Sequence, residues 1–66
     1  MTTIKELRQR AGLTISELAQ KAGVSTPTVY RLERGDSVTR VYAAKVCNAL
    51  GIDITQVQGL NIKKEG

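Results

Sequence analysis

The side chains in this sequence that are best suited to chemistry are the hydroxyl and guanidinium groups between residues 25 and 40. Thr26, Thr28 and Arg31 fall on one polar face of a helix predicted over 26–34. The amino end of a helix favours anions. An arginine can place two donors against the O6 and N7 acceptors of a guanine, and a threonine can bond either base type. The pattern therefore indicates contacts to bases and phosphates rather than catalysis.

Catalytic and metal-binding residues are scarce in the sequence. It contains no histidine and one cysteine, Cys47, so an internal disulfide is excluded and a metal site is not expected. The six carboxylates are scattered, and no glycine-rich phosphate loop is present. We therefore expect no enzyme activity and no cofactor. Cys47 lies on the apolar stripe of a predicted helix and is interpreted as a core residue, with a redox-sensing role as the alternative.

Length and charge narrow the class of partner. The 66 residues fit one domain, and ten Lys and Arg against six Asp and Glu give a net charge of +4. A basic balance suggests a polyanionic partner. Two tyrosines and no other aromatic side chain argue against stacking on single-stranded nucleic acid. Because the sequence has no membrane-length apolar run and no signal-peptide core, we expect a cytoplasmic protein without a membrane partner.

The elements that must position these residues are short helices. Residues that can cap a helix, such as Thr14, Ser25 and Thr39, precede segments with helical apolar spacing, and glycines follow most of them. No segment shows the alternation typical of a strand. The chain is therefore predicted to be all-α, with a domain at 1–62 and a short flexible tail at 63–66. The five predicted helices cover about 4–10, 15–22, 26–34, 40–50 and 54–58.

Residues 13–35 carry the strongest functional signal. Two predicted helices, 15–22 and 26–34, are separated by a short turn that contains Gly23. A turn this short forces the helices to cross steeply, and the small side chain of Ala19 lets them approach. The second helix keeps a free polar face. These features are typical of a helix-turn-helix unit whose second helix can enter the major groove of DNA.

Several short motifs also resemble those of a known family. In order and at the family's spacing, the chain contains Gly12-Leu13-Thr14, Glu17-Leu18-Ala19, Ala22-Gly23-Val24-Ser25, Val29-Tyr30-Arg31-Leu32-Glu33-Arg34-Gly35 and Ala49-Leu50-Gly51-Ile52. From about Ile4 to Leu60 the sequence thus resembles the lambda-repressor and Cro-like helix-turn-helix domains, the XRE type. The resemblance implies a compact five-helix fold with the motif in the second and third helices. It also implies sequence-specific binding to double-stranded DNA as a dimer.

The resemblance assigns base contacts to the start of the 26–34 helix. Pro27 stands where many relatives have a polar base-reading residue, so it offers only an apolar surface. Tyr30 lies at the flank of the helix and is expected either to contact DNA or to cover the edge of the core. The base-contacting positions of the family fall on Thr26, Pro27, Thr28 and Arg31.

The resemblance also assigns contacts to the DNA backbone and one structural pair. Many relatives bind a phosphate through a glutamine where this chain has Ile15, so Ser16 or Thr14 is expected to replace that contact. Arg8 and Glu33 match a pair that forms a salt bridge beneath the recognition helix. The DNA-backbone positions are Thr14, Ser16, Tyr30, Arg34, Ser37, Thr39 and Arg40.

These features predict a DNA-binding transcriptional regulator, in particular a repressor. Two copies would place their 26–34 helices in successive major grooves, ~34–36 Å apart, on a roughly palindromic site. A homodimer that forms mainly on DNA is expected, and no small-molecule effector is expected because the sequence leaves no room for an effector domain. The predicted dimer contact consists of Val57, Leu60 and Ile62.

A second hypothesis places the chain in a different class of protein. The same fold can serve as a protein-interaction module or as the DNA-targeting subunit of an antitoxin. Arg31, Arg34 and Arg40 favour DNA, although each can also be a solvated surface side chain. Ile15 and Pro27 argue mildly against DNA. Binding to random duplex DNA at low salt would separate the two hypotheses.

Overall fold

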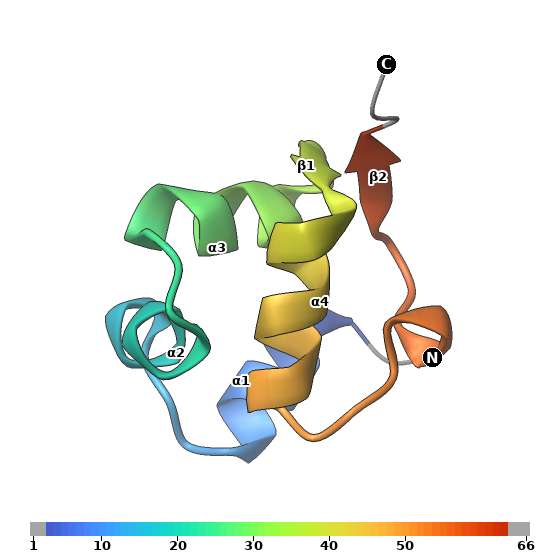
Figure 1. The fold of residues 1–66 in the computed structure, drawn as a ribbon. Helices are drawn as coiled ribbons and strands as arrows, with labels where there is room; N and C mark the ends of the chain where they lie inside the picture. Colours follow the sequence, from blue (N-terminus) through green and yellow to red (C-terminus); the bar gives the residue numbers. More distant parts are fainter. Residues whose placement is uncertain (1–2, 64–66) are drawn as a thin grey trace.

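The computed structural model describes residues 3–63, which are mainly helical (Figure 1). Four α-helices contribute to one core, and two short strands pair beside them. The helices are α1 (Ile4–Arg10), α2 (Ile15–Ala22), α3 (Thr26–Arg34) and α4 (Arg40–Ala49). The strands are β1 (Ser37–Thr39) and β2 (Asn61–Lys63), and a 3₁₀ turn, η1 (Ile54–Gln56), lies between α4 and β2.

Helix α2 shows why the predicted helix ends agree with the structure. The Thr14 hydroxyl accepts a hydrogen bond from the Glu17 amide at 3.1 Å, and the Glu17 carboxylate accepts one from the Thr14 amide at 2.9 Å. These two bonds form a capping box, and the bond that the Glu17 carboxylate accepts from the Thr14 amide lowers the pKa of Glu17. The helix ends at Gly23, whose φ of 74° lies in the left-handed region that glycine adopts most easily. Both signals are local, so the sequence alone was sufficient to place this helix.

The fifth helix predicted at 54–58 is wrong as an α-helix, because the structure has only the turn η1 there. The Asp53 carboxylate does cap this turn by accepting a hydrogen bond from the Thr55 amide at 2.9 Å. The backbone becomes extended at Val57, with φ −95° and ψ 133°. Starting a helix costs more than one turn returns, and Gly59 follows at a φ of 79° that redirects the chain.

The strict all-α prediction also missed the parallel β1–β2 pair. In its register Ser37 pairs with Asn61, Val38 with Ile62, and Thr39 with Lys63. Strands of three residues are too short to show a period of two, and these strands are far apart in the sequence. Lys63, the first residue of the predicted tail, lies in β2, while residues 64–66 lie outside the described part.

The core fixes which face of α3 remains free. Val29 and Leu32 of α3 are buried in the same cluster as Leu18 and Ala19 of α2. Figure 1 looks nearly along α2, with α3 lying across the view, so the two helices cross steeply as predicted. Cys47 is buried in the cluster, and this burial raises the pKa of its thiol. The thiol therefore behaves as a small core side chain.

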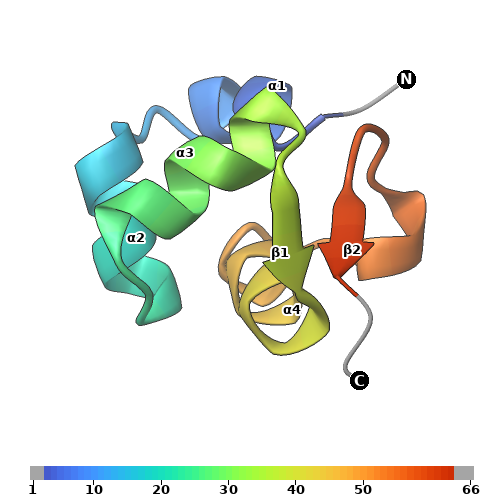
Figure 2. The same ribbon diagram turned by 90° about the horizontal axis from the view of Figure 1, so that it is seen from above.

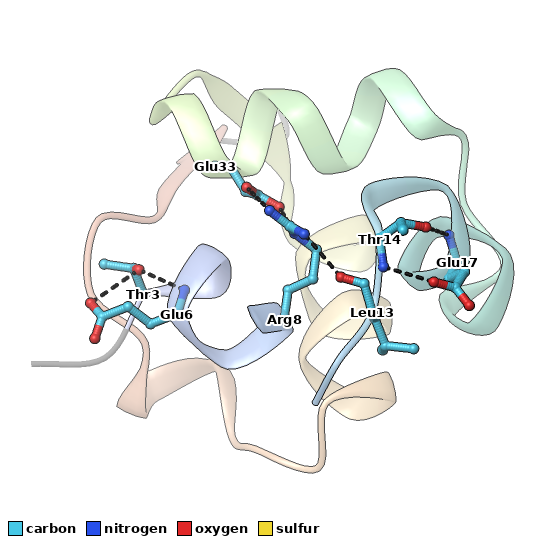
Figure 3. A network of polar contacts seen from close by, with 7 residues as sticks. All are labelled: Thr3, Glu6, Arg8, Leu13, Thr14, Glu17 and Glu33. Carbon is cyan, nitrogen blue, oxygen red and sulfur yellow. Dashed lines mark hydrogen bonds and ion pairs between the residues drawn. The ribbon is translucent and has the colours of Figure 1, made fainter. Parts of the chain in front are cut away.

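A side-chain network joins α1 to α3 (Figure 3). Arg8 Nε donates to Glu33 Oε2 at 2.7 Å, and Arg8 Nη2 donates to Glu33 Oε1 at 3.2 Å. Arg8 Nη1 also donates to the Leu13 carbonyl at 2.9 Å. Only 13% of the Arg8 side chain and 9% of the Glu33 side chain are exposed, so water screens the pair little. The predicted ion pair between Arg8 and Glu33 is therefore present in the structure. Its hydrogen bond raises the pKa of the Arg8 guanidinium above the usual value.

A double-mutant cycle measures how strongly this pair holds α3. We expect Arg8→Ala and Glu33→Ala each to lower the free energy of unfolding, with a coupling energy of about 1–3 kcal/mol. The cycle cancels the loss of the Leu13 bond, which both variants lacking Arg8 share. Urea denaturation followed by circular dichroism gives the four free energies.

The exposed Arg34–Asp36 ion pair provides a matched control for this cycle. Its coupling should stay below about 1 kcal/mol, because both side chains face water. A coupling for Arg8 and Glu33 no larger than that of the control would show that the pair does not hold the helix.

Candidate functional site

The outward face of α3 carries four of the residues that sequence analysis assigned to binding. Val29 and Leu32 point into the core, which leaves Pro27, Tyr30, Arg31 and Arg34 exposed and Thr26 and Thr28 half-buried. Figure 2 shows that α3, β1 and β2 lie on the same side of the molecule, above α4. The exposed side chains of α3 are thus presented at the molecular surface.

The amino end of α3 keeps its positive partial charge. Ser25 occupies the N-cap position, as predicted. However, its side chain makes no hydrogen bond to the helix backbone, and its hydroxyl instead pairs with the Thr28 hydroxyl at 2.8 Å. Within the described chain, the first turn of α3 contains no acidic residue. The helix dipole is therefore not neutralised at this end, which suits an approaching anion.

The loop after α3 contains an ion pair that sequence reasoning missed. Arg34 and Asp36 bond to one another at the surface, where 69% and 44% of their side chains are exposed. The Asp36 amide also donates to the Arg31 carbonyl at 2.9 Å, next to the left-handed Gly35. The charge of Arg34 is thus partly balanced by its neighbour. The sequence signal that could have indicated this ion pair is that the two opposite charges are only two residues apart.

Strand β1 brings further polar groups beside α3. Val38 is buried and anchors the strand, while Ser37 is exposed, Thr39 is half-buried and Arg40 is exposed at the start of α4. A cavity of about 140 Å³ lies between α3, β1, α4 and β2. Four of its lining residues, Thr28, Arg31, Ser37 and Thr39, were predicted to contact DNA, whereas Lys63 was assigned to the tail and Tyr42 was given no role.

Other predicted contact residues lie apart from this cavity. Thr14 and Ser16 are exposed at the amino end of α2, where the Thr14 hydroxyl is engaged in the capping box. Tyr30 is 54% exposed. It precedes Glu33, the partner of Arg8, by three residues and therefore lies toward the α1 side of α3.

The residues of the predicted dimer contact differ in exposure. Val57 and Leu60 are half-buried and pack against the core. Ile62, in β2, is exposed. Most of the apolar surface of this set is therefore already used inside the chain.

Neither a metal-binding cluster nor a membrane-spanning helix occurs within residues 3–63. No group of three or more His, Cys, Asp or Glu side chains in this range is arranged to hold a metal ion. None of the helices described there combines the length and apolar character needed to cross a membrane.

Comparisons with known proteins agree with this geometry. The helix-turn-helix family model matches residues 4–57. An HTH-type transcriptional regulatory protein of Pyrobaculum aerophilum is 41% identical over 59 residues, which is 88% of this chain and 24% of that protein. HTH-type transcriptional regulators of Methanothermobacter thermautotrophicus and Bacillus subtilis, the latter named YgzD, are 41% identical over 51 residues and 36% identical over 55 residues.

The coverage of these relatives differs. The chain spans about a quarter of the Pyrobaculum protein, but 74% of the Methanothermobacter protein and 83% of YgzD. The matches cover 76% and 82% of this chain, respectively. No solved structure gives a significant match. The match of the family model, and the α2–turn–α3 unit that it covers, show that this chain belongs to the XRE-type helix-turn-helix family.

Proposed function

We propose that this chain is a transcriptional regulator that binds double-stranded DNA and reads its sequence with α3 in the major groove. The exposed polar face of α3 is the observation that carries the proposal, because α2 and the core leave that face free. Regulators of transcription among the relatives support the same role. The uncapped amino end of α3 and the exposed Arg31, Arg34 and Arg40 supply positive potential around it.

The contacts divide into two kinds in this proposal. Base edges are read by residues of the first two turns of α3, with the exposed Arg31 as the guanine reader. The residues around these base-reading positions bind DNA phosphates. Such phosphate contacts fix the position of the helix without reading the base sequence. The base-reading set is Thr26, Pro27, Thr28 and Arg31, and the phosphate set is Thr14, Ser16, Tyr30, Arg34, Ser37, Thr39 and Arg40.

The proposal extends to assembly and mode of control. Two copies bind a roughly palindromic DNA site, with their α3 helices about one helical turn of DNA apart. They repress transcription by occupying this site. The contact between copies involves Val57, Leu60 and Ile62. Because two of these residues already pack against the core, the area left for a partner is small, and the copies pair mainly on DNA.

Replacing Arg31 tests the base-reading role directly. Sites are first selected from a random pool of duplexes, and affinities are then measured for the selected site and its single-base variants. We expect Arg31→Ala to cost about 1–3 kcal/mol on the selected site and to relax discrimination at one base pair, because its two donors face one guanine. Arg10→Ala, at the exposed end of α1, is the matched control. An equal loss on every sequence would make Arg31 a phosphate contact instead.

Replacing Asp36 tests whether the loop after α3 faces phosphate. We expect Asp36→Asn to raise the affinity for any duplex by about two- to fivefold, because it frees Arg34 and removes a negative charge. Fluorescence anisotropy with specific and random duplexes measures the change. Glu6→Gln alters the net charge equally, on the exposed surface of α1. If the two variants bind DNA alike, the loop does not lie against the DNA backbone.

A further inference from the structure

The cavity beside α3 is lined mainly by hydroxyl and cationic side chains. Four hydroxyl side chains and two cations surround it, with Val38 as an apolar wall, and none of these described lining residues is acidic. Hydroxyl groups and cations together are the donors that bind oxyanions. The polar lining consists of Thr28, Arg31, Ser37, Thr39, Tyr42 and Lys63.

Strand pairing is what brings Lys63 to this cavity. The parallel register places Lys63 opposite Thr39, and Figure 2 shows β1 and β2 side by side on the face that carries α3. Val38 is buried at the centre of β1 and fixes that strand against the core. A lysine from the far end of the sequence thus joins Arg31 of α3 at one site.

The amino end of α4 adds to the positive potential of the cavity. Thr39 is its N-cap residue, but no side chain caps this end in the described chain, and the first turn has no acidic residue. Tyr42, in that first turn, lines the cavity. The dipole of this ten-residue helix therefore acts in the same direction as Arg31 and Lys63.

The size of the cavity limits its occupant. Its volume of about 140 Å³ corresponds to roughly four or five water molecules at ~30 Å³ each. Sites for cofactors and drug-sized ligands begin at about 300 Å³. A single phosphate group therefore matches this volume.

We propose that this cavity is a phosphate site that holds one backbone phosphate of the bound DNA, with Lys63 as the principal cation and the Tyr42 hydroxyl as a donor. The inference rests on the proposed function, because α3 forms one wall of the cavity. Lys63 and Tyr42 are thus DNA-contacting residues in addition to those named from the sequence. The β1–β2 pair thereby contributes to DNA affinity and not only to the fold.

The salt dependence of DNA binding tests this site. We expect Lys63→Gln to reduce the slope of log affinity against log salt by about 0.9 per bound copy, equally on specific and random duplexes. Lys5→Gln, exposed on α1, is the control with the same loss of charge and should keep the wild-type slope. Tyr42→Phe should lower affinity on every sequence without changing the slope. Circular dichroism checks that each variant is folded.

The outcomes separate this inference from the proposed function. If the wild-type chain does not bind duplex DNA even at low salt, the proposed function fails. If the wild type binds and Lys63→Gln matches Lys5→Gln, only the phosphate site is overturned. Titration of the chain with inorganic phosphate, with chloride replaced to keep the ionic strength constant, tests whether the site binds free phosphate instead of a DNA phosphate. Saturable phosphate binding that needs Lys63, with DNA binding unaffected by Lys63→Gln, would overturn the assignment to DNA.

Discussion

The Arg8 side chain connects three parts of the fold: α1, the segment between α1 and α2, and α3. Its guanidinium bonds both carboxylate oxygens of Glu33 on α3 and the Leu13 carbonyl between α1 and α2. Apolar packing is not directional, whereas a bidentate ion pair fixes one orientation. Because Glu33 lies on the inner side of α3, the same contact leaves Arg31 on the outer, exposed side. The position of the reading face therefore depends on this pair as well as on the buried Val29 and Leu32.

The local features of the fold were predictable from the sequence. Thr14 and Glu17 form their capping box because the two residues meet within one helical turn, whatever the rest of the chain does. Gly23 and Gly35 end α2 and α3 because both positions require a positive φ. The resemblance to a family supplied the Arg8–Glu33 pair, which spacing alone does not indicate. These residues are enough to place the helix-turn-helix unit.

The remaining features depend on contacts between distant residues. Nothing near Lys63 in the sequence indicates that it pairs with Thr39, because parallel strands of three residues leave no periodic signal. The cavity lined by Lys63 and Tyr42 follows from that pairing and was missed for the same reason. Asp53 caps η1 as expected, but a cap alone does not extend a turn into a helix when Gly59 follows. Tyr42 and Lys63, the two cavity residues that were not predicted, lie beside the predicted DNA-contacting residues. They therefore enlarge the predicted DNA-binding surface and do not change its position.

The proposed DNA-binding face consists of α3, β1 and the start of α4. Mapping backbone amide shifts during titration of the ¹⁵N-labelled chain with duplex DNA at low salt locates that face directly. The largest shifts should fall in the first turns of α3, in β1 and around Arg40, with small shifts in η1 and on the exposed side of α1. Largest shifts in α1 or η1, or no shifts at all, would contradict it.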